Sequence, residues 1–428
     1  MSGFLKHKSL PLITQVVFIS LVSISSFGDN LTSKWGLDWY GYYEGKNLND
    51  RVVDPTNQIF ELPYASVVSD FRPDGKFSFG SFDLRVQPRW EFTEDWIGYT
   101  DGARVSKAHG YFDFSQIYLN WTASDIFMFS FGLQNYQWGP AEMLSPSNGL
   151  IHFSTSQRSL IWVEPGHWLG RINISFGKNW SLIGIEELID NRKPAWIAGS
   201  SFSPRGLVKF EYRTDDGTNY LGMTAGGSGD NNLQSWVGEY ATYSPLESLS
   251  IYIDARQVRG SYAYYPETVG NFVQMQQSLY TSNQIYGLTE TGLRYEGRVD
   301  SRIEYIQNDI GYTREDFTQA VRGASQLSPF LPTNLPKFLH PGLELYSQHY
   351  LYGSIRIPDL GKKKLYTVIA RCLYSITDSS STYSASIQRI WGDYVNLFLE
   401  ASYLTGENNT ELGFINEAEL MAGMRLSF

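Results

Sequence analysis

The stretch LMAGMRLSF, residues 420–428, decides the fold expected for this chain. Its even-numbered residues, from Leu420 to Phe428, are all apolar, whereas Gly423, Arg425 and Ser427 stand between them. Because successive side chains of a strand point to opposite faces, this alternation predicts a strand with one apolar and one polar face. An ordinary amphipathic strand has the same pattern, so other segments must decide what this strand belongs to.

A C-terminal strand that ends in Phe428 resembles the assembly signal of bacterial outer-membrane β-barrels. The resemblance implies an all-β fold, a transmembrane antiparallel barrel in the bacterial outer membrane. It also implies two partners, the outer-membrane lipid and the barrel-assembly machinery that reads this signal.

The N-terminus predicts export. Lys6 and Lys8 precede an apolar run over 10–22, and the small residues Ser26 and Gly28 stand before Asp29. The run is shorter than the about 20 apolar residues of a membrane-spanning helix, which disfavours an anchor. We therefore predict a cleaved signal peptide over 1–28, with cleavage after Gly28 and Ser25 as the second candidate, and one barrel domain over 29–428.

Composition and motifs narrow the function classes. The chain is 15% aromatic and 18% charged, with a formal net charge of −10, and this acidity argues against nucleic acid as a partner. The sequence contains no Gly-x-Ser-x-Gly, His-Glu-x-x-His or phosphate-loop motif, and single histidines are more often solvated than ligating. We predict no enzyme activity, no catalytic residue, no metal and no cofactor.

Two segments carry the barrel pattern most clearly. Between Phe82 and Phe92, apolar residues alternate with five polar ones. Between Phe127 and Leu133, large aromatic or aliphatic side chains alternate with small or polar residues. The first pattern also fits a soluble β-sandwich, but the second fits a lipid-facing wall better than a packed core.

Similar patterns along the chain predict about 18 strands, with 16 as the second choice. Short polar segments, such as 72–75, 177–179 and 215–217, are expected as periplasmic turns. Long segments are expected as external loops, namely 137–167, 259–284, 309–342 and 405–417, with 195–202 also treated as loop. One of them has helical character at 313–321, although a disordered loop fits equally well.

One motif stands out after the strand over 127–134: Trp138, Gly139 and Pro140, followed by Glu142 and a long polar loop. The Trp-Gly-Pro sequence resembles that of Wzi-type capsule-assembly barrels and related porin-like proteins. The resemblance implies a loop that folds over or into the lumen. The alternative is a tryptophan of the interfacial aromatic belt with a Gly-Pro turn behind it.

Residues on the polar faces of the strands are the candidates for a charge-lined constriction, because lumen residues set selectivity. They are Asp83, Arg85, Arg89, Glu91, Arg171, Asp254, Arg256, Arg294 and Arg302. Bases opposite acids across a lumen produce a transverse field that favours polar solutes. The same charges could instead pair across neighbouring strands and only stabilise the wall.

We therefore predict a porin-like channel for passive diffusion of small polar solutes through a loop-constricted lumen. A barrel that binds surface polysaccharide is the alternative, with Trp138, Trp162, Tyr262, Tyr264 and Tyr265 stacking on sugars. An outer-membrane hydrolase is third. If the loop enters the lumen, we expect it to face Arg85, Arg89 and Arg171, with Glu142 as the acidic partner.

Overall fold

The computed structural model describes most of the chain after residue 30. The described residues are 31–48, 53–54, 56–150, 161, 166–189, 204–228, 235–261, 263–277, 284–325, 330–414 and 418–428. The expected signal peptide and the segment 195–202 lie outside them.

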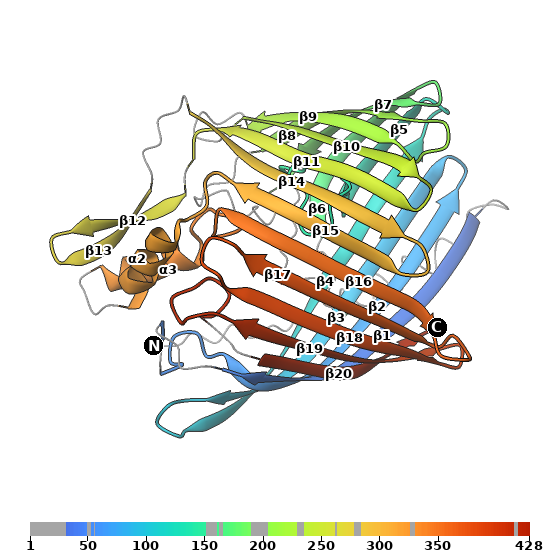
Figure 1. Ribbon diagram of the computed structural model, residues 1–428. Coiled ribbons are helices and arrows are strands. Elements are labelled where there is room, and N and C mark those ends of the chain that lie inside the picture. Colours follow the sequence, from blue (N-terminus) through green and yellow to red (C-terminus); the bar gives the residue numbers. More distant parts are fainter. Residues whose placement is uncertain are drawn as a thin grey trace.

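Eighteen strands form one closed antiparallel barrel, because β1 pairs with both β2 and β20 (Figure 1). The prediction of an all-β barrel of 18 strands is confirmed. The strands are β1 (Leu31–Asn47), β2 (Pro63–Phe79), β3 (Phe82–Gly98), β4 (Arg104–Thr122), β5 (Phe127–Gln134), β6 (His167–Phe176), β7 (Trp180–Glu187), β8 (Arg205–Arg213), β9 (Tyr220–Ser228), β10 (Trp236–Leu246), β11 (Leu249–Arg259), β14 (Ile285–Glu296), β15 (Asp300–Asn308), β16 (His349–Leu360), β17 (Tyr366–Ser375), β18 (Ser381–Trp391), β19 (Val395–Thr405) and β20 (Ala418–Ser427).

The alternation along each strand sorts its side chains between the outside and the lumen. In β11, Ile251 and Ile253 face outward and are exposed, whereas Tyr252 and Asp254 between them are buried inside the barrel. Large apolar side chains exposed in this way recur on most strands. An apolar outer wall around a polar interior is the arrangement that a lipid bilayer stabilises.

The first strand begins and the last strand finishes on the side of the barrel that carries the short turns. Phe428 exchanges backbone hydrogen bonds with Leu37, so β20 joins β1 there. The segment 72–75, expected as a turn, is instead part of β2, and the chain turns later, at Gly80 and Ser81. The prediction was wrong because Pro73 and Gly75, which read as turn residues, are tolerated inside this strand.

The external end carries a small subdomain that projects from the barrel (Figure 1). It contains the hairpin of β12 (Tyr264–Val269) and β13 (Phe272–Gln277), and the helices α2 (Arg314–Ser325) and α3 (Leu331–Leu339). Phe317, Phe338 and Phe414 pack in its core. The helix expected at 313–321 is therefore confirmed, whereas the hairpin within 259–284 was not foreseen. Neither described helix is long and apolar enough to cross a membrane.

Candidate functional site

The chain turns into the lumen directly after β5. Trp138 is 8% exposed, and the residues 143–150 that follow are all buried within the barrel. Gly139 has a φ of 97°, and a Cβ at this position would collide with the Asp254 carboxylate. The Trp-Gly-Pro motif thus marks the entry of this segment, which we call the lumen loop (residues 135–150).

Three carboxylates of the barrel wall hold the lumen loop. Glu304 accepts hydrogen bonds from the backbone N–H groups of Glu142 (2.7 Å) and Met143 (3.0 Å). Glu290 accepts one from Leu144 (3.1 Å), and Asp254 accepts one from Ser147 (2.6 Å). All three carboxylates are 0% exposed, and Asp254 lies directly opposite Glu290 on the neighbouring strand. Because like charges so placed repel, the loop N–H groups are what make this row stable.

An aromatic contact fixes the loop on its other side. The ammonium of Lys209, on β8, lies 5.4 Å from the Trp138 ring and 5.6 Å from the Tyr136 ring. The Lys209 side chain is 2% exposed and pairs with Glu211 at 2.9 Å. Trp138 is therefore a buried anchor, which corrects both the interfacial belt and the sugar-stacking interpretation of this residue. Tyr264 and Tyr265 pack against the core of the external subdomain, and Trp162 and Tyr262 lie outside the described residues.

The end of the lumen loop and Ile161 contact two different walls of the barrel. Leu150 packs in a cluster with Trp236 of β10. The carbonyl of Ile161, however, accepts a hydrogen bond from Arg72 of β2 (2.6 Å), and its side chain packs near Tyr40. Leu150 and Ile161 therefore lie on opposite sides of the barrel.

A cavity of about 560 Å³ lies between the lumen loop and the periplasmic ends of β14 to β18. Four arginines line it, and its roof is formed by 137–142 of the loop. The wall residues are Arg294, Asp300, Arg302, Ser354, Arg356, Thr367, Ile369, Arg371 and Gln388. We call the arginine-bearing part of the wall, strands β14 to β17, the arginine wall.

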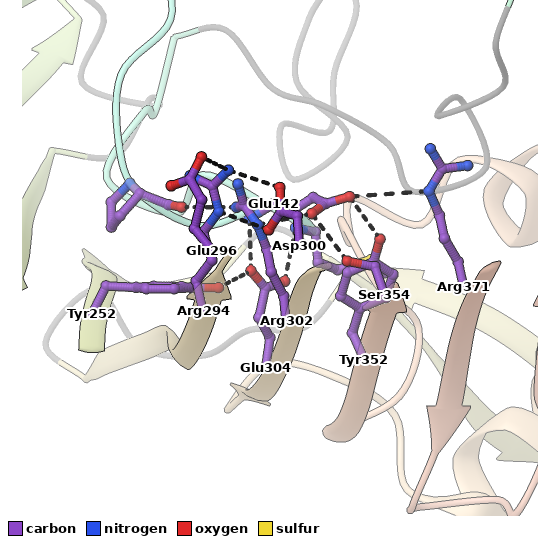
Figure 2. Close-up of polar contacts among 12 residues, drawn as sticks. Glu142, Tyr252, Arg294, Glu296, Asp300, Arg302, Glu304, Tyr352, Ser354 and Arg371 are labelled. Atoms are coloured by element: carbon purple, nitrogen blue, oxygen red, sulfur yellow. Dashed lines mark hydrogen bonds and ion pairs between the residues drawn. The ribbon is translucent and has the colours of Figure 1, made fainter. Parts of the chain in front are cut away.

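Glu142 of the loop meets this wall (Figure 2). Its carboxylate lies 3.1 Å from Arg302 Nε and 4.0 Å from Arg371 Nε. The hydroxyls of Tyr352 and Ser354 donate to it at 3.1 Å each. Arg356 has no hydrogen bond or ion pair with any residue that the structure describes. The arrangement leaves positive charge facing the cavity, because one carboxylate serves two guanidinium groups.

Arg294, at the periplasmic edge of the cavity, is held differently. It donates to Asp300 (2.9 and 2.8 Å) and to Glu296 (2.9 Å) across the β14–β15 hairpin (Figure 2). This guanidinium is saturated by its own hairpin, so the free charge of the site belongs to Arg302, Arg356 and Arg371.

The predicted residues on β3 lie in the lumen but away from this cavity. Asp83 accepts a hydrogen bond from Ser78, and Arg85 pairs with Asp74 (2.9 Å). Arg89 pairs with Asp70 (2.7 Å) and with Glu91. The expectation that Glu142 would face Arg85 and Arg89 was wrong, since the loop leans toward β15 and β17 and leaves these arginines to carboxylates of β2 and β3.

Three other predicted residues contact the inserted segments. The guanidinium of Arg171 lies 4.2 Å from the centre of the Tyr136 ring. Asp254 belongs to the carboxylate row, and Arg256 pairs with Glu344 of an external loop (2.8 Å). Glu290, Arg356 and Asp70 were missed by the sequence reading. The alternation within β14, β16 and β2 places these three side chains on the inner face. The expected strand boundaries were misplaced by a few residues, so the three were not recognised as inward-facing.

Outside the membrane-spanning strands, one buried acid ties two external loops together above the arginine wall. Glu411 accepts hydrogen bonds from the backbone N–H groups of Tyr346 (3.2 Å) and Ser347 (3.1 Å), and from the hydroxyl of Tyr350. Burial and the nearby Asp378 together raise the pKa of Glu411 to about 7, although the hydrogen bonds from Tyr350, Ser347 and Tyr346 act to lower it.

Comparisons with known proteins agree with this geometry. No protein-family model and no curated protein sequence matches the chain. Among solved structures, it is similar to OccAB1 of Acinetobacter baumannii (TM-score 0.53, 11% identity, covering 92% of this chain and 96% of that one) and to OccK5 of Pseudomonas aeruginosa (TM-score 0.53, 12% identity, 92% and 98%). It is also similar to Wzi of Escherichia coli, an outer-membrane protein involved in group 1 capsule assembly and described as a carbohydrate-binding β-barrel (TM-score 0.53, 12% identity, 97% and 88%).

The chain has the fold of a porin-like outer-membrane β-barrel. Its closed, outwardly apolar barrel belongs in the bacterial outer membrane. Identities of 11–12% show the shared fold, and the chemistry of the lumen must be judged from this chain's own residues. Within the described residues, no group of three or more His, Cys, Asp or Glu side chains is placed to hold a metal ion.

Proposed function

We propose that this porin-like barrel conducts small polar solutes by passive diffusion, with a preference for anions. The arginine wall carries the proposal: Arg302, Arg356 and Arg371 face a cavity under the lumen loop, and Arg302 and Arg371 share one acid, Glu142. A wall with excess positive charge concentrates anions and slows cations. The lumen loop narrows the passage so that solutes pass within reach of these guanidinium groups.

The test is single-channel recording of the purified protein in a planar bilayer under a salt gradient. We expect conductance with a reversal potential that reports anion preference. The double variant Arg302→Gln with Arg371→Gln should lower the anion-to-cation permeability ratio several-fold. The matched control, Arg85→Gln with Arg89→Gln, removes the same two charges from the opposite wall and should change the ratio much less, because those arginines are already neutralised.

A barrel that binds surface polysaccharide is the second candidate, and a separate observation favours it. The lumen loop packs Met143 and Leu144 against Leu345 and Leu412 of the external loops, which places apolar contacts inside the barrel above the arginine wall. A closed lumen suits a binding protein better than a channel.

The two candidates differ in the same recording. A protein that inserts, shows no conductance and still binds purified capsular polysaccharide would replace the channel proposal with the second candidate. Conductance with equal permeability ratios in the wild-type protein and in both double variants would keep the channel but remove the arginine wall as its selectivity element.

A further inference from the structure

The hairpin of β3 and β4 rises beyond the rest of the barrel on the external side, at the lower left of Figure 1. β4 is 19 residues long and pairs with β3 from Arg104 to Trp121. On its other edge it pairs with β5 only from Ile117 to Thr122. The upper half of β4 therefore has a neighbour on one side only, among the residues that the structure describes.

Aromatic side chains mark where this hairpin leaves the membrane. Trp90 and Phe112 pack on its outer face with ring centres 4.9 Å apart, and Phe114 joins them at 5.1 Å. Above this belt the outer residues of β4 itself are small or polar, although Phe92 and Trp96 continue on the outer face of β3. Those of β4 are Gly110, Ala108, Ser106 and Arg104, and Ser106 donates to Glu94 (2.8 Å). Because aromatic belts lie at the membrane surface, the part of β4 from residue 110 back to 104 stands in water.

The hydrogen-bond pattern shows which backbone groups of β4 have no partner among the described residues. Tyr99 N–H donates to the carbonyl of Ala103 (3.0 Å), so alternate residues from Val105 onward bond to β3. The N–H and C=O groups of Ser106, Ala108 and Gly110 then point away from β3. Every residue from 104 to 113 is exposed.

The lower limit of the free edge is also defined. The carbonyl of Ser115 accepts a hydrogen bond from Gly166 (3.0 Å), and the N–H of Phe114 donates to the Asp113 carboxylate (2.7 Å). Below these contacts the edge is covered, so the open row of backbone groups spans 104–112.

We propose that this edge is a strand-addition site for an extended segment of a partner protein outside the cell. A row of unpaired backbone donors and acceptors is complemented by another strand. Lys107, His109 and Tyr111 lie on the inner face beside the edge, so a segment with polar side chains at alternate positions fits.

A second copy in the same membrane does not fit. Strands of such barrels tilt by about 35–45°, so a copy rotated about the membrane normal would present its edge strand crossed at twice that angle. Antiparallel pairing of two β4 edges would require one barrel to be inverted.

The test uses a phage-displayed library of nine-residue peptides with alternating apolar and polar positions, selected on the purified barrel in lipid nanodiscs. Selected peptides should bind the wild-type protein and bind Ala108→Pro at least tenfold more weakly, because proline removes an edge donor that β3 does not use. The control Ala108→Val keeps the N–H and should bind within about threefold of wild type.

Folding of the proline variant does not decide the outcome, because a second measurement uses wild-type protein alone. Each selected peptide is also made in two N-methylated forms, one methylated at its odd-numbered and one at its even-numbered residues. Only every second N–H of an added strand faces β4, so one form should lose binding and the other should keep it. Failure to select any peptide, equal binding to both variants, or equal binding of both N-methyl frames would overturn the proposal. Self-association that Ala108→Pro abolishes would overturn it in favour of a second copy.

Discussion

Arginines line both sides of the lumen, but the two sides hold them differently. On the β2–β3 side, the wall supplies its own carboxylates, and Asp70 alone accepts hydrogen bonds from Arg72 and Arg89. On the arginine wall, Arg302 and Arg371 share Glu142, which belongs to the lumen loop. The first side is neutral within itself, whereas the second depends on an inserted segment and keeps charge for a solute.

If the barrel conducts as proposed, an inward-facing arginine is therefore not by itself a selectivity residue. What decides its role is whether a carboxylate stands within reach on the same or the next strand. Stability and selectivity should therefore respond to substitutions on opposite sides of the barrel.

The largest expected effect is on the paired side. Asp70→Asn should destabilise the folded barrel by about 3–5 kcal/mol, because the carboxylate is 0% exposed and its loss leaves Arg72 without an anion and Arg89 with Glu91 alone. The measurement is the urea midpoint of unfolding in lipid vesicles, followed by gel mobility of the folded form.

Arg356→Gln is the matched variant on the arginine wall. It should change the unfolding free energy by less than about 1 kcal/mol while lowering anion preference, since this arginine has no ion pair among the described residues. If Asp70→Asn altered selectivity and left stability unchanged, the division between the two sides would be wrong.

The second prediction tests which side chains face the lipid and which face the lumen, because the comparison of the two lumen walls depends on that assignment. Ile387 of β18 faces outward and is 40% exposed, whereas its neighbour Gln388 lines the cavity. Ile387→Arg should cost about 2–4 kcal/mol near the bilayer midplane, and Gln388→Arg should cost little because it faces water. Reversible unfolding in vesicles measures both, and similar costs would contradict the assigned faces.

The third and smallest prediction concerns the loops above the arginine wall. The pKa of Glu411 is raised to about 7 in the folded protein from its ordinary value of 4.5, so the protein binds this proton more tightly than the unfolded chain does. The stabilisation is full below about pH 4.5 and is lost as the pH rises through about 7. It is on the order of 1–3 kcal/mol.

We therefore expect the amides of 343–348 and 410–413 to exchange with deuterium more slowly at pH 5 than at pH 8, after correction for the intrinsic rate. The variant Glu411→Gln, which cannot ionise, should remove this difference between the two pH values. If the variant still exchanged more slowly at pH 5 than at pH 8, a titratable group other than Glu411 would cause the pH dependence.

Much of the fold was predictable from the sequence, because alternation reports directly which side of a strand meets lipid. The site was predictable only in part. Trp138, Gly139 and Pro140 marked the entry of the loop, but the direction in which it leans depends on Glu304 and Glu290, which are far away in the sequence. The pairing of Arg89 with Asp70 depends on strand register, which local patterns do not specify.

The carboxylate row under the lumen loop has a consequence for any state in which that loop is displaced. Asp254, Glu290 and Glu304 would then lose the backbone N–H groups that donate to them, and three carboxyl groups would face the open passage. Glu142 would leave the arginines at the same moment. If the barrel conducts as proposed, displacement of the loop would therefore add acidic groups to the passage and weaken its preference for anions.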